Sequence, residues 1–341
     1  MSGGGRDQPL GVAVVGLGIG EQHARRLAGL DRVCLRALLD HDAAKARRLA
    51  DQLGALTVPP DYEALLGDPQ VEAVVIASYD DDHAAQTLAA LQAGKHVFVE
   101  KPLCRTLDEL RAIKAAWAGH GGRLKLSSNL ILRAAPLYRW LKTQCESGRL
   151  GRIYSVDGEY LYGRLEKITA GWRAHVEGYS AMLGGGIHLI DLMLWLTGER
   201  PATVYAAGNR LSTEGTAFRY QDFIAATFEF PSTMVGRIVA NFGCVHPHQH
   251  VLRLYGTGAT FLVDDAGPRW HESRDPAQGA SPLTLDPLPA HKGDLLPEFV
   301  LAILSGRDWD AHTQAHLDTI SVCVAADHAL ATNAPVKVTY I

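Results

Sequence analysis

Short apolar runs alternate with helical segments over the first third of the chain, and this order restricts the fold more than any other feature. Strands are predicted at 10–15, 33–39, 71–77 and 97–99, and helices at 21–30, from 43, at 82–94 and at 107–118. Strands separated by helices of this length form a parallel sheet that helices cover on both faces. Ligands of such sheets bind at the carboxyl ends of the strands.

A glycine-rich turn, Gly16-Leu17-Gly18-Ile19-Gly20, joins the first predicted strand to the first predicted helix. A turn of this kind lets backbone N–H groups at a helix N-terminus approach the pyrophosphate of a dinucleotide, so all five residues are predicted cofactor contacts. The usual Gly-x-Gly-x-x-Gly spacing would place glycine where this chain has Glu21, so the turn is expected to be one residue shorter. A plain strand-to-helix turn is the alternative.

Asp40 ends the second predicted strand, about twenty residues after the glycines. A carboxylate at this position can accept hydrogen bonds from both ribose hydroxyls, and it would repel a 2′-phosphate. The sequence therefore predicts NAD rather than NADP as the cofactor. The alternative is that Asp40 caps the helix starting near Ala43, a role that Asp42 can fill as well.

Polar residues follow the next two strands where ligands gather. Ser78, Tyr79, His83, Glu100 and Lys101 are predicted to contact the cofactor. The stretch from Val97 to Leu103 is interpreted as a buried strand that ends before Pro102 and presents Lys101 to the ligand. A surface turn with an internal salt bridge is the alternative for Glu-Lys-Pro.

The acidic run Asp80-Asp81-Asp82 precedes a predicted helix, where the helix dipole favours negative charge. A contact to a cationic substrate is the alternative, and it gives a mild preference for an aminosugar.

The composition excludes several classes of protein. The chain has 341 residues, enough for two domains, and a formal net charge of −4, so nucleic acid and anionic membranes are not expected partners. No apolar run reaches membrane-spanning length, and the first residues lack the apolar core of a signal peptide, so a cytoplasmic protein is expected. The five cysteines are scattered, which favours reduced thiols over a disulfide framework or a zinc site.

The periodicity changes in the second half of the chain. Strands are predicted at 153–162, 204–211, 224–230, 234–242, 251–256 and 260–263, and helices at 133–148, from 188 and at 313–332. The alternating strands predict a mostly antiparallel open sheet. The expected fold is therefore α/β, with a doubly wound Rossmann domain at 1–128 and an α+β domain for substrate binding and oligomerisation at 129–341.

His188 follows a triple glycine and begins a helical run. The glycines would allow close approach to a ligand, and an imidazole suits proton transfer near neutral pH, so His188 is a candidate general base. A structural histidine is the alternative. Trp172, Arg173 and Tyr179, which precede the glycines, are candidate substrate contacts.

The sequence His246-Pro247-His248-Gln249-His250 could place alternate imidazoles on one face as metal ligands. Its proline and expected turn favour an ordinary polar loop, and no metal site is predicted.

Several segments together resemble the glucose-fructose oxidoreductase, inositol dehydrogenase and rhizopine-catabolism (Gfo/Idh/MocA) family of NAD(P)-dependent oxidoreductases. The resemblance covers nearly the whole chain and is carried by 15–18, 23–24, 39–40, 83–84, 93–103, 150–153, 188–191 and 255–258. It implies a dinucleotide-binding first domain and a second domain whose open sheet is often an oligomer surface. It also implies that Lys101 touches both the nicotinamide ribose and a substrate hydroxyl, and that Asn129 lines the nicotinamide side and the substrate.

The chain departs from this family at one position of the expected active site. Many members carry an aspartate four residues before the histidine, where this chain has Gly184. Tyr179, Glu177 or the substrate itself could take over the orientation of the sugar hydroxyl.

The resemblance implies an NAD-dependent dehydrogenase or ketoreductase that moves a hydride between nicotinamide and a secondary alcohol or ketone. The substrate would be a sugar, aminosugar, sugar conjugate or cyclitol, with His188 as the base and Lys101 stabilising the oxygen charge. Alternatives are a catalytically silent protein that senses dinucleotide and sugar, and an enzyme that recycles its NAD internally. A homodimer or homotetramer is expected.

Overall fold

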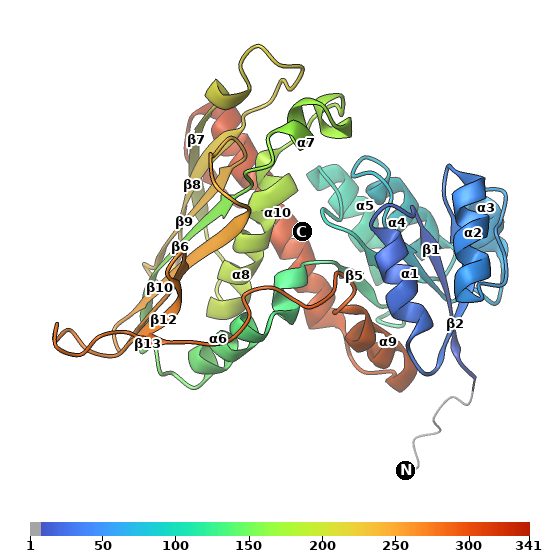
Figure 1. The fold of residues 1–341 in the computed structure, drawn as a ribbon, viewed down its shortest axis with the longest axis horizontal. Helices are drawn as coiled ribbons and strands as arrows, with labels where there is room; N and C mark the ends of the chain where they lie inside the picture. Colours follow the sequence, from blue (N-terminus) through green and yellow to red (C-terminus); the bar gives the residue numbers. More distant parts are fainter. Residues whose placement is uncertain (1–7) are drawn as a thin grey trace. The chain divides into compact units, whose positions relative to one another are not determined.

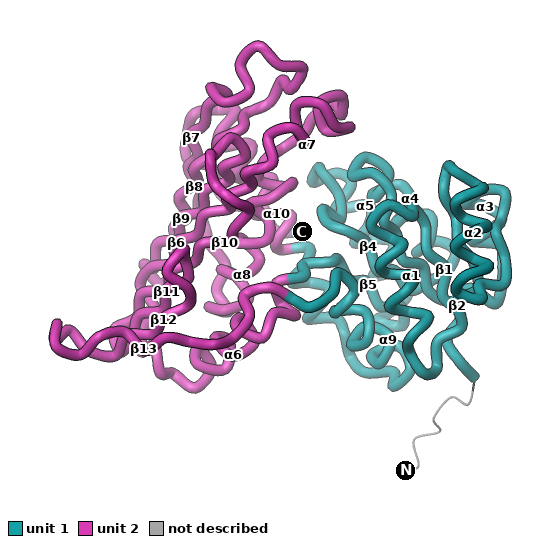
Figure 2. Tube along the Cα trace, in the orientation of Figure 1, with its two compact units in different colours: residues 1–131, 289–317, 341 teal, residues 132–288, 318–340 magenta. Residues whose placement is uncertain are grey.

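The computed structural model describes residues 8–341, which fall into two compact units (Figure 2). Unit 1 comprises residues up to 131 together with 289–317 and 341, and unit 2 comprises 132–288 and 318–340. The segment 289–317 therefore groups with the first unit, whereas the sequence-based division assigned it to the second domain. The functional division at 128/129 stays a prediction. Residues 1–7, which carry most of the segment used to predict that no leader is present, lie outside the described residues.

Unit 1 is built on a five-stranded parallel sheet with the strand order β2-β1-β3-β4-β5. The strands are β1 (Leu10–Val15), β2 (Val33–Leu39), β3 (Ala73–Ile76), β4 (His96–Val99) and β5 (Leu126–Ser128). All residues of β1 and β3 are buried, as expected for central strands that are covered on both faces. The predicted Rossmann-type sheet is confirmed, although β3 is shorter than the predicted 71–77.

The helices of unit 1 begin and end at local signals in the sequence. They are α1 (Gly20–Ala28), α2 (Ala43–Leu53), α3 (Tyr62–Gly67), α4 (His83–Gln92), α5 (Leu107–Ala118) and α9 (Leu296–Ser305). Asp42 caps α2 by accepting from two backbone N–H groups, and Gly54 ends it in a left-handed conformation. Thr106 and Glu109 form a capping box at the start of α5. Asp42 thus fills the capping role that was the alternative for Asp40.

Unit 2 is built on a nine-stranded sheet with the order β13-β12-β11-β10-β6-β9-β8-β7-β14. The strands are β6 (Ile153–Leu161), β7 (Thr203–Asn209), β8 (Phe223–Glu229), β9 (Val235–Asn241), β10 (Gln249–Gly256), β11 (Thr260–Asp264), β12 (Gly267–His271), β13 (Ser281–Pro282) and β14 (Val336–Lys337). Pairing is antiparallel except between β6 and β9. The predicted mostly antiparallel sheet is confirmed, and β12, β13 and β14 are additions to it.

One face of this sheet carries the helices of unit 2 (Figure 1). These are α6 (Pro136–Glu146), α7 (Glu166–Thr169), α8 (Ile187–Thr197) and α10 (Asp310–Thr332), whose first residues belong to unit 1, together with short helical turns at Ile131–Ala134, Trp172–Ala174, Met182–Gly186 and Leu211–Thr213. Helix α6 starts later than the predicted 133 because Ala135 precedes a proline and is extended. Buried and exposed residues alternate along β8, which fits a sheet with one open face.

No helix in the described part of the chain is long and apolar enough to cross a membrane.

Candidate active site

The glycine turn between β1 and α1 gives each of its three glycines a different steric environment. Gly16 has a φ of +79°, and a Cβ there would lie 2.5 Å from the Ala77 carbonyl oxygen. A Cβ on Gly18 would meet no protein atom within 4 Å, whereas one on Gly20 would press on Val14 and Ala77 at 3.1 and 3.2 Å. The three glycines of a dinucleotide-binding turn have the same three functions: the first allows the tight turn, the second leaves room for the ligand, and the third lets the helix pack closely on the strand.

Helix α1 begins directly at this turn without a side-chain cap, so within residues 8–341 no capping side chain occupies its first N–H groups. The residues present therefore fit a pyrophosphate, despite the shorter spacing of the glycines.

Asp40 lies beside the glycine turn at the end of β2. Its Oδ2 accepts a hydrogen bond from the Leu17 backbone N–H at 2.6 Å, and its Oδ1 accepts one from Asp42 N–H at 2.9 Å. The carboxylate is therefore fixed against the turn, and its remaining lone pairs can accept from hydroxyl groups. The position fits the ribose role predicted for Asp40.

Glu100 is the centre of a hydrogen-bond network at the carboxyl end of β4. Its Oε1 lies 2.8 Å from His23 Nε2 on α1 and accepts from Asn129 Nδ2 at 2.7 Å. Burial raises the pKa of Glu100, but the hydrogen bonds and charges of His23, Asn129 and Lys101 outweigh it and lower the pKa to about 2. Glu100 is thus an anion that ties α1 and β5 to the end of β4.

Asn129, which follows β5, also donates to the Lys292 carbonyl oxygen at 3.1 Å. Its amide N–H groups therefore hold the protein framework of unit 1, next to the predicted cofactor edge.

Lys101 lies between two anchored neighbours. Before it, Glu100 is held by the network described above, and Glu100 Oε2 accepts from the Lys101 backbone N–H at 3.3 Å. After it, the Pro102 carbonyl oxygen lies 2.7 Å from His83 Nδ1, while His83 Nε2 lies 3.2 Å from the Ser78 carbonyl oxygen. His83 is buried, so it acts as a brace between the ends of β3 and β4. Anchoring on both sides restricts the backbone from which the lysine side chain extends.

Ser78 and Tyr79 lie at the same edge of the sheet of unit 1. The Ser78 hydroxyl donates to Gln86 Oε1 at 2.7 Å, and Tyr79 is 50% exposed. Tyr79 is therefore accessible to a ligand. The acidic run that follows contributes no side-chain cap to α4, so its predicted role at this helix rests on charge alone.

His188 stands in the first turn of α8, directly after a π-helical turn at Met182–Gly186. Two glycines of this turn lack side chains where aromatic rings pack directly against the helix backbone. A Cβ on Gly184 would lie 2.2 Å from Tyr179 Oη, and a Cβ on Gly185 would lie 2.3 Å from the Tyr160 ring. Residues 184 and 188 are four apart and share one helix face. The Tyr179 hydroxyl therefore fills the position of a side chain at 184, one turn before His188.

Sequence reasoning missed the rings around His188. Its ring lies 6.2 Å from that of Tyr160 on β6 and 5.7 Å from that of His250 on β10. Tyr160 and His250 are direct neighbours across the two strands. Burial raises the pKa of Tyr160, so its phenol stays protonated, and the imidazoles are the groups of this cluster that suit proton transfer. The strand alternation of both segments was visible in the sequence, but the register that pairs them was not.

Trp172 and Arg173 lie in a short helical turn before the π-helical turn. The Arg173 guanidinium stacks on the Trp172 ring, with 4.4 Å between the guanidinium carbon and the ring centroid. The two residues form one flat, cationic surface element of unit 2, which is compatible with their predicted substrate contact.

Two of the three histidines of 246–250 stay together, since the rings of His248 and His250 lie 4.9 Å apart, and His246 has a partner of its own. His246 pairs with Asp265 at 3.1 Å, whereas His248 Nδ1 lies 3.0 Å from the Leu161 carbonyl oxygen and His250 packs beside His188. Within residues 8–341, no group of three or more His, Cys, Asp or Glu side chains is arranged to hold a metal ion.

Comparison with known protein families gives two matches that together span most of the chain. Residues 10–128 match the model of an oxidoreductase family with an NAD-binding Rossmann fold, and residues 138–262 match the GFO/IDH/MocA C-terminal domain. The chain belongs to the Gfo/Idh/MocA oxidoreductase family. The resemblance seen in the sequence is therefore confirmed, and with it the predicted pairing of a Rossmann domain with a second α/β domain.

Individual relatives agree with this family. The chain is 33% identical over 206 residues to an inositol 2-dehydrogenase from Acidothermus cellulolyticus, a match that covers 60% of this chain and 58% of that protein. The crystal structure of myo-inositol 2-dehydrogenase from Lactobacillus plantarum superimposes with a TM-score of 0.82 at 20% identity, covering 97% of this chain and 100% of that one. Levoglucosan dehydrogenase in complex with NADH and L-sorbose superimposes with a TM-score of 0.84 at 21% identity, covering 97% and 99%. The two structures establish likeness of fold.

Proposed function

We propose that this protein is an NAD-dependent oxidoreductase that moves a hydride between nicotinamide and a secondary alcohol or ketone. Its substrate is a sugar, aminosugar, sugar conjugate or cyclitol. The observation that carries the proposal is the anchoring of Lys101 at the carboxyl end of β4, between Glu100 and the His83-braced Pro102 carbonyl. An inositol 2-dehydrogenase among the relatives and an NADH complex among the structural neighbours support the substrate class and the cofactor.

The residues of unit 1 that would hold NAD are the glycine turn, for the pyrophosphate, and Asp40, for the ribose hydroxyls. NAD supplies the hydride acceptor when it is bound. Asp40 favours NAD over NADP because its carboxylate would repel a 2′-phosphate. Ser78, Tyr79 and Asn129 complete the edge of unit 1 that faces the cofactor in this proposal.

Lys101 and His188 carry the proton chemistry of the proposed reaction. The Lys101 ammonium would hydrogen-bond the carbinol oxygen and stabilise the negative charge that develops on it. His188 would accept the hydroxyl proton as general base and return it when a ketone is reduced. The ring of His250 packs beside His188 within unit 2, so the imidazole of His188 has a polar and polarisable neighbour.

Tyr179 is proposed to orient the substrate in place of the aspartate that many family members carry at position 184. Its hydroxyl stands 2.2 Å from the site of a Cβ on Gly184, so it occupies the space through which an aspartate would extend. A phenol can both donate and accept a hydrogen bond with a substrate hydroxyl. Trp172 and Arg173 would contact the same substrate from the preceding segment.

The test is the absorbance change of reduced nicotinamide when purified protein and NAD meet a panel of sugars, aminosugars, nucleotide sugars and inositols. Lys101→Ala is expected to lose nearly all turnover while still binding NAD, and Lys114→Ala, on α5 of the same unit, serves as the lysine control. His188→Gln is expected to lower kcat about a hundred- to ten-thousand-fold, with the exposed His328→Gln as the histidine control.

Near-normal turnover of Lys101→Ala would contradict the assignment. NAD binding without turnover on any substrate would favour the sensor, and product formation without net NADH would favour internal recycling.

The protein is further proposed to act in the cytoplasm as a homodimer or homotetramer, as the family resemblance implies.

A further inference from the structure

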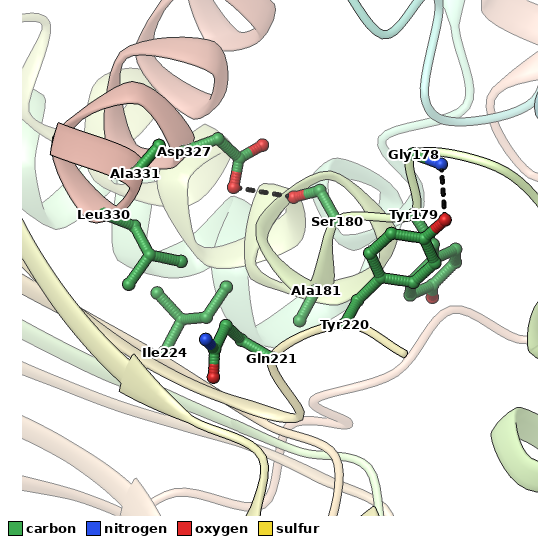
Figure 3. Close-up of a pocket in the computed structure, with 10 residues that line it drawn as sticks. All are labelled: Gly178, Tyr179, Ser180, Ala181, Tyr220, Gln221, Ile224, Asp327, Leu330 and Ala331. Atoms are coloured by element: carbon green, nitrogen blue, oxygen red, sulfur yellow. Dashed lines mark hydrogen bonds between the residues drawn. The ribbon is translucent and has the colours of Figure 1, made fainter. Parts of the chain in front are cut away.

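A cavity of about 490 Å³ lies within unit 2, beside the segment that leads into the π-helical turn. Its volume is in the range that holds small ligands. Figure 3 shows side chains of α10, of β8 and of the segment before the π-helical turn arranged around a common space. The lining includes Ser180, Tyr220, Gln221, Ile224, Asp327 and Leu330.

The carboxylate of Asp327 is the strongest polar group of this cavity. One of its oxygens accepts a hydrogen bond from Ser180 Oγ at 2.8 Å, and Ser180 Oγ in turn accepts from the Leu183 backbone N–H at 3.1 Å. Among the residues the structure describes, the second oxygen of Asp327 receives no hydrogen bond, and no lysine, arginine or histidine forms an ion pair with it. A half-buried carboxylate without a cation leaves a charge to be balanced.

The described groups around Asp327 contribute no compensating charge. Burial raises the pKa of Asp327 to about 7, and the Ser180 hydroxyl offsets part of that rise. On the same helix, burial holds the pKa of Cys323 well above its ordinary value, so this thiol stays neutral. The segment before the π-helical turn, the residues just before β8 and β8 itself contribute hydroxyl, amide and aliphatic side chains to the lining.

We propose that this cavity binds the protonated amino group of a small polyhydroxylated amine. The free oxygen of Asp327 would accept from the ammonium group. Tyr220 Oη already accepts from the Gly178 N–H at 2.8 Å, so its own proton is available to a ligand hydroxyl, and the Gln221 amide offers a further donor and acceptor. Ile224 and Leu330 would contact the carbon skeleton. The proposal does not depend on hydride transfer, because binding can be measured without turnover.

Isothermal titration with 1-amino-1-deoxysorbitol, and with sorbitol as the neutral match, tests this proposal. At about pH 8 the wild-type protein is expected to bind the amine at least about tenfold more tightly than sorbitol, because only the amine can pair with the carboxylate. Asp327→Asn keeps the shape of the side chain and should remove the difference. Glu229→Gln removes the same charge from an exposed position on the other face of β8, and should leave the difference intact.

Two further measurements keep the test decisive if Asp327→Asn folds poorly. Ala331→Phe, at an exposed lining position, should weaken amine binding by narrowing the cavity. In the wild-type protein the amine should bind about tenfold more weakly at about pH 6 than at about pH 8, because the carboxylate gains a proton below its pKa of about 7 while the amine stays charged. Equal affinity for amine and sorbitol, or amine binding that survives both substitutions, would overturn the proposal.

Discussion

The close approach of Tyr179 to Gly184 predicts an energetic coupling that a double-mutant cycle can measure. The Cβ of Gly184→Ala would stand 2.2 Å from Tyr179 Oη and 2.7 Å from Cζ, far inside the ordinary carbon contact of about 3.5–4.0 Å. The tyrosine cannot move freely, because it is 6% exposed and its ring packs against Phe218 and Phe242. Forced overpacking of this kind costs about 1–3 kcal/mol.

Whether Gly184→Ala raises or lowers the free energy of unfolding should depend on the residue at position 179. Replacing glycine by alanine within a helix stabilises it by about 0.5–1 kcal/mol when no clash occurs. In the Tyr179→Leu background the clash is absent, so Gly184→Ala should then be stabilising, whereas it should be neutral or destabilising beside the tyrosine. The expected coupling free energy is about 1–3 kcal/mol.

Urea unfolding of the four proteins gives this coupling from their free energies of unfolding. Gly185→Ala is the matched control, because its Cβ meets the Tyr160 ring at 2.3 Å and its cost should be the same in both backgrounds. Additive effects of Tyr179→Leu and Gly184→Ala would refute the close approach, and with it the proposal that the Tyr179 hydroxyl takes the place of an aspartate.

Two further predictions concern buried carboxylates. The pKa of Glu100 is lowered from 4.5 to about 2, so its ionised form contributes roughly 3 kcal/mol of stability, present above about pH 4.5 and lost as the pH falls toward about 2. In acid unfolding followed by circular dichroism, Glu100→Gln should not lose this stability between about pH 4.5 and about pH 2. If its stability falls with pH in parallel with that of the wild type, the network around Glu100 is contradicted. Asp191→Asn should lower the free energy of unfolding in urea by about 3–5 kcal/mol. Asp191 accepts a hydrogen bond from the buried Arg133 at 2.9 Å, and the substitution removes the charge that balances this guanidinium. Glu272→Gln, at an exposed ion pair, is the control and should change stability little. An equal effect of both substitutions would contradict this assignment.

Local sequence signals predicted most of unit 1. The ends of β1 and β2, the capping of α2 and the start of α5 follow from residues within one turn of each boundary, and they appear where they were expected. Strand β3 is shorter than predicted at both ends. In unit 2, the start of α6 differs from the prediction because the proline at 136 sets it. Ser78, Tyr79, His83 and Glu100 lie at the ends of β3 and β4 because the order of strands alone determines which edge they share.

Contacts between distant segments were beyond the reach of the sequence patterns. His23 and Asn129 meet at Glu100 although 77 and 29 residues separate them from it. Segment 289–317 belongs to unit 1, and β6 pairs in parallel with β9. Neither fact can be predicted from nearby residues, because hydrophobic periodicity shows which face of an element is buried but not which segment packs against that face. His250 lies next to Tyr160 because of strand register, which the turn signals of this region did not specify.

The sequence by itself determined the α/β fold, the family and the chemistry of the candidate residues, because strand order, glycine positions and residue types are written locally. Tertiary structure decided how those residues are held. It placed the Tyr179 hydroxyl at the face of Gly184 and left the Asp327 carboxylate in a cavity without a cation among the described residues. Both depend on which side chains fill a given space, and packing between segments far apart in the chain settles that.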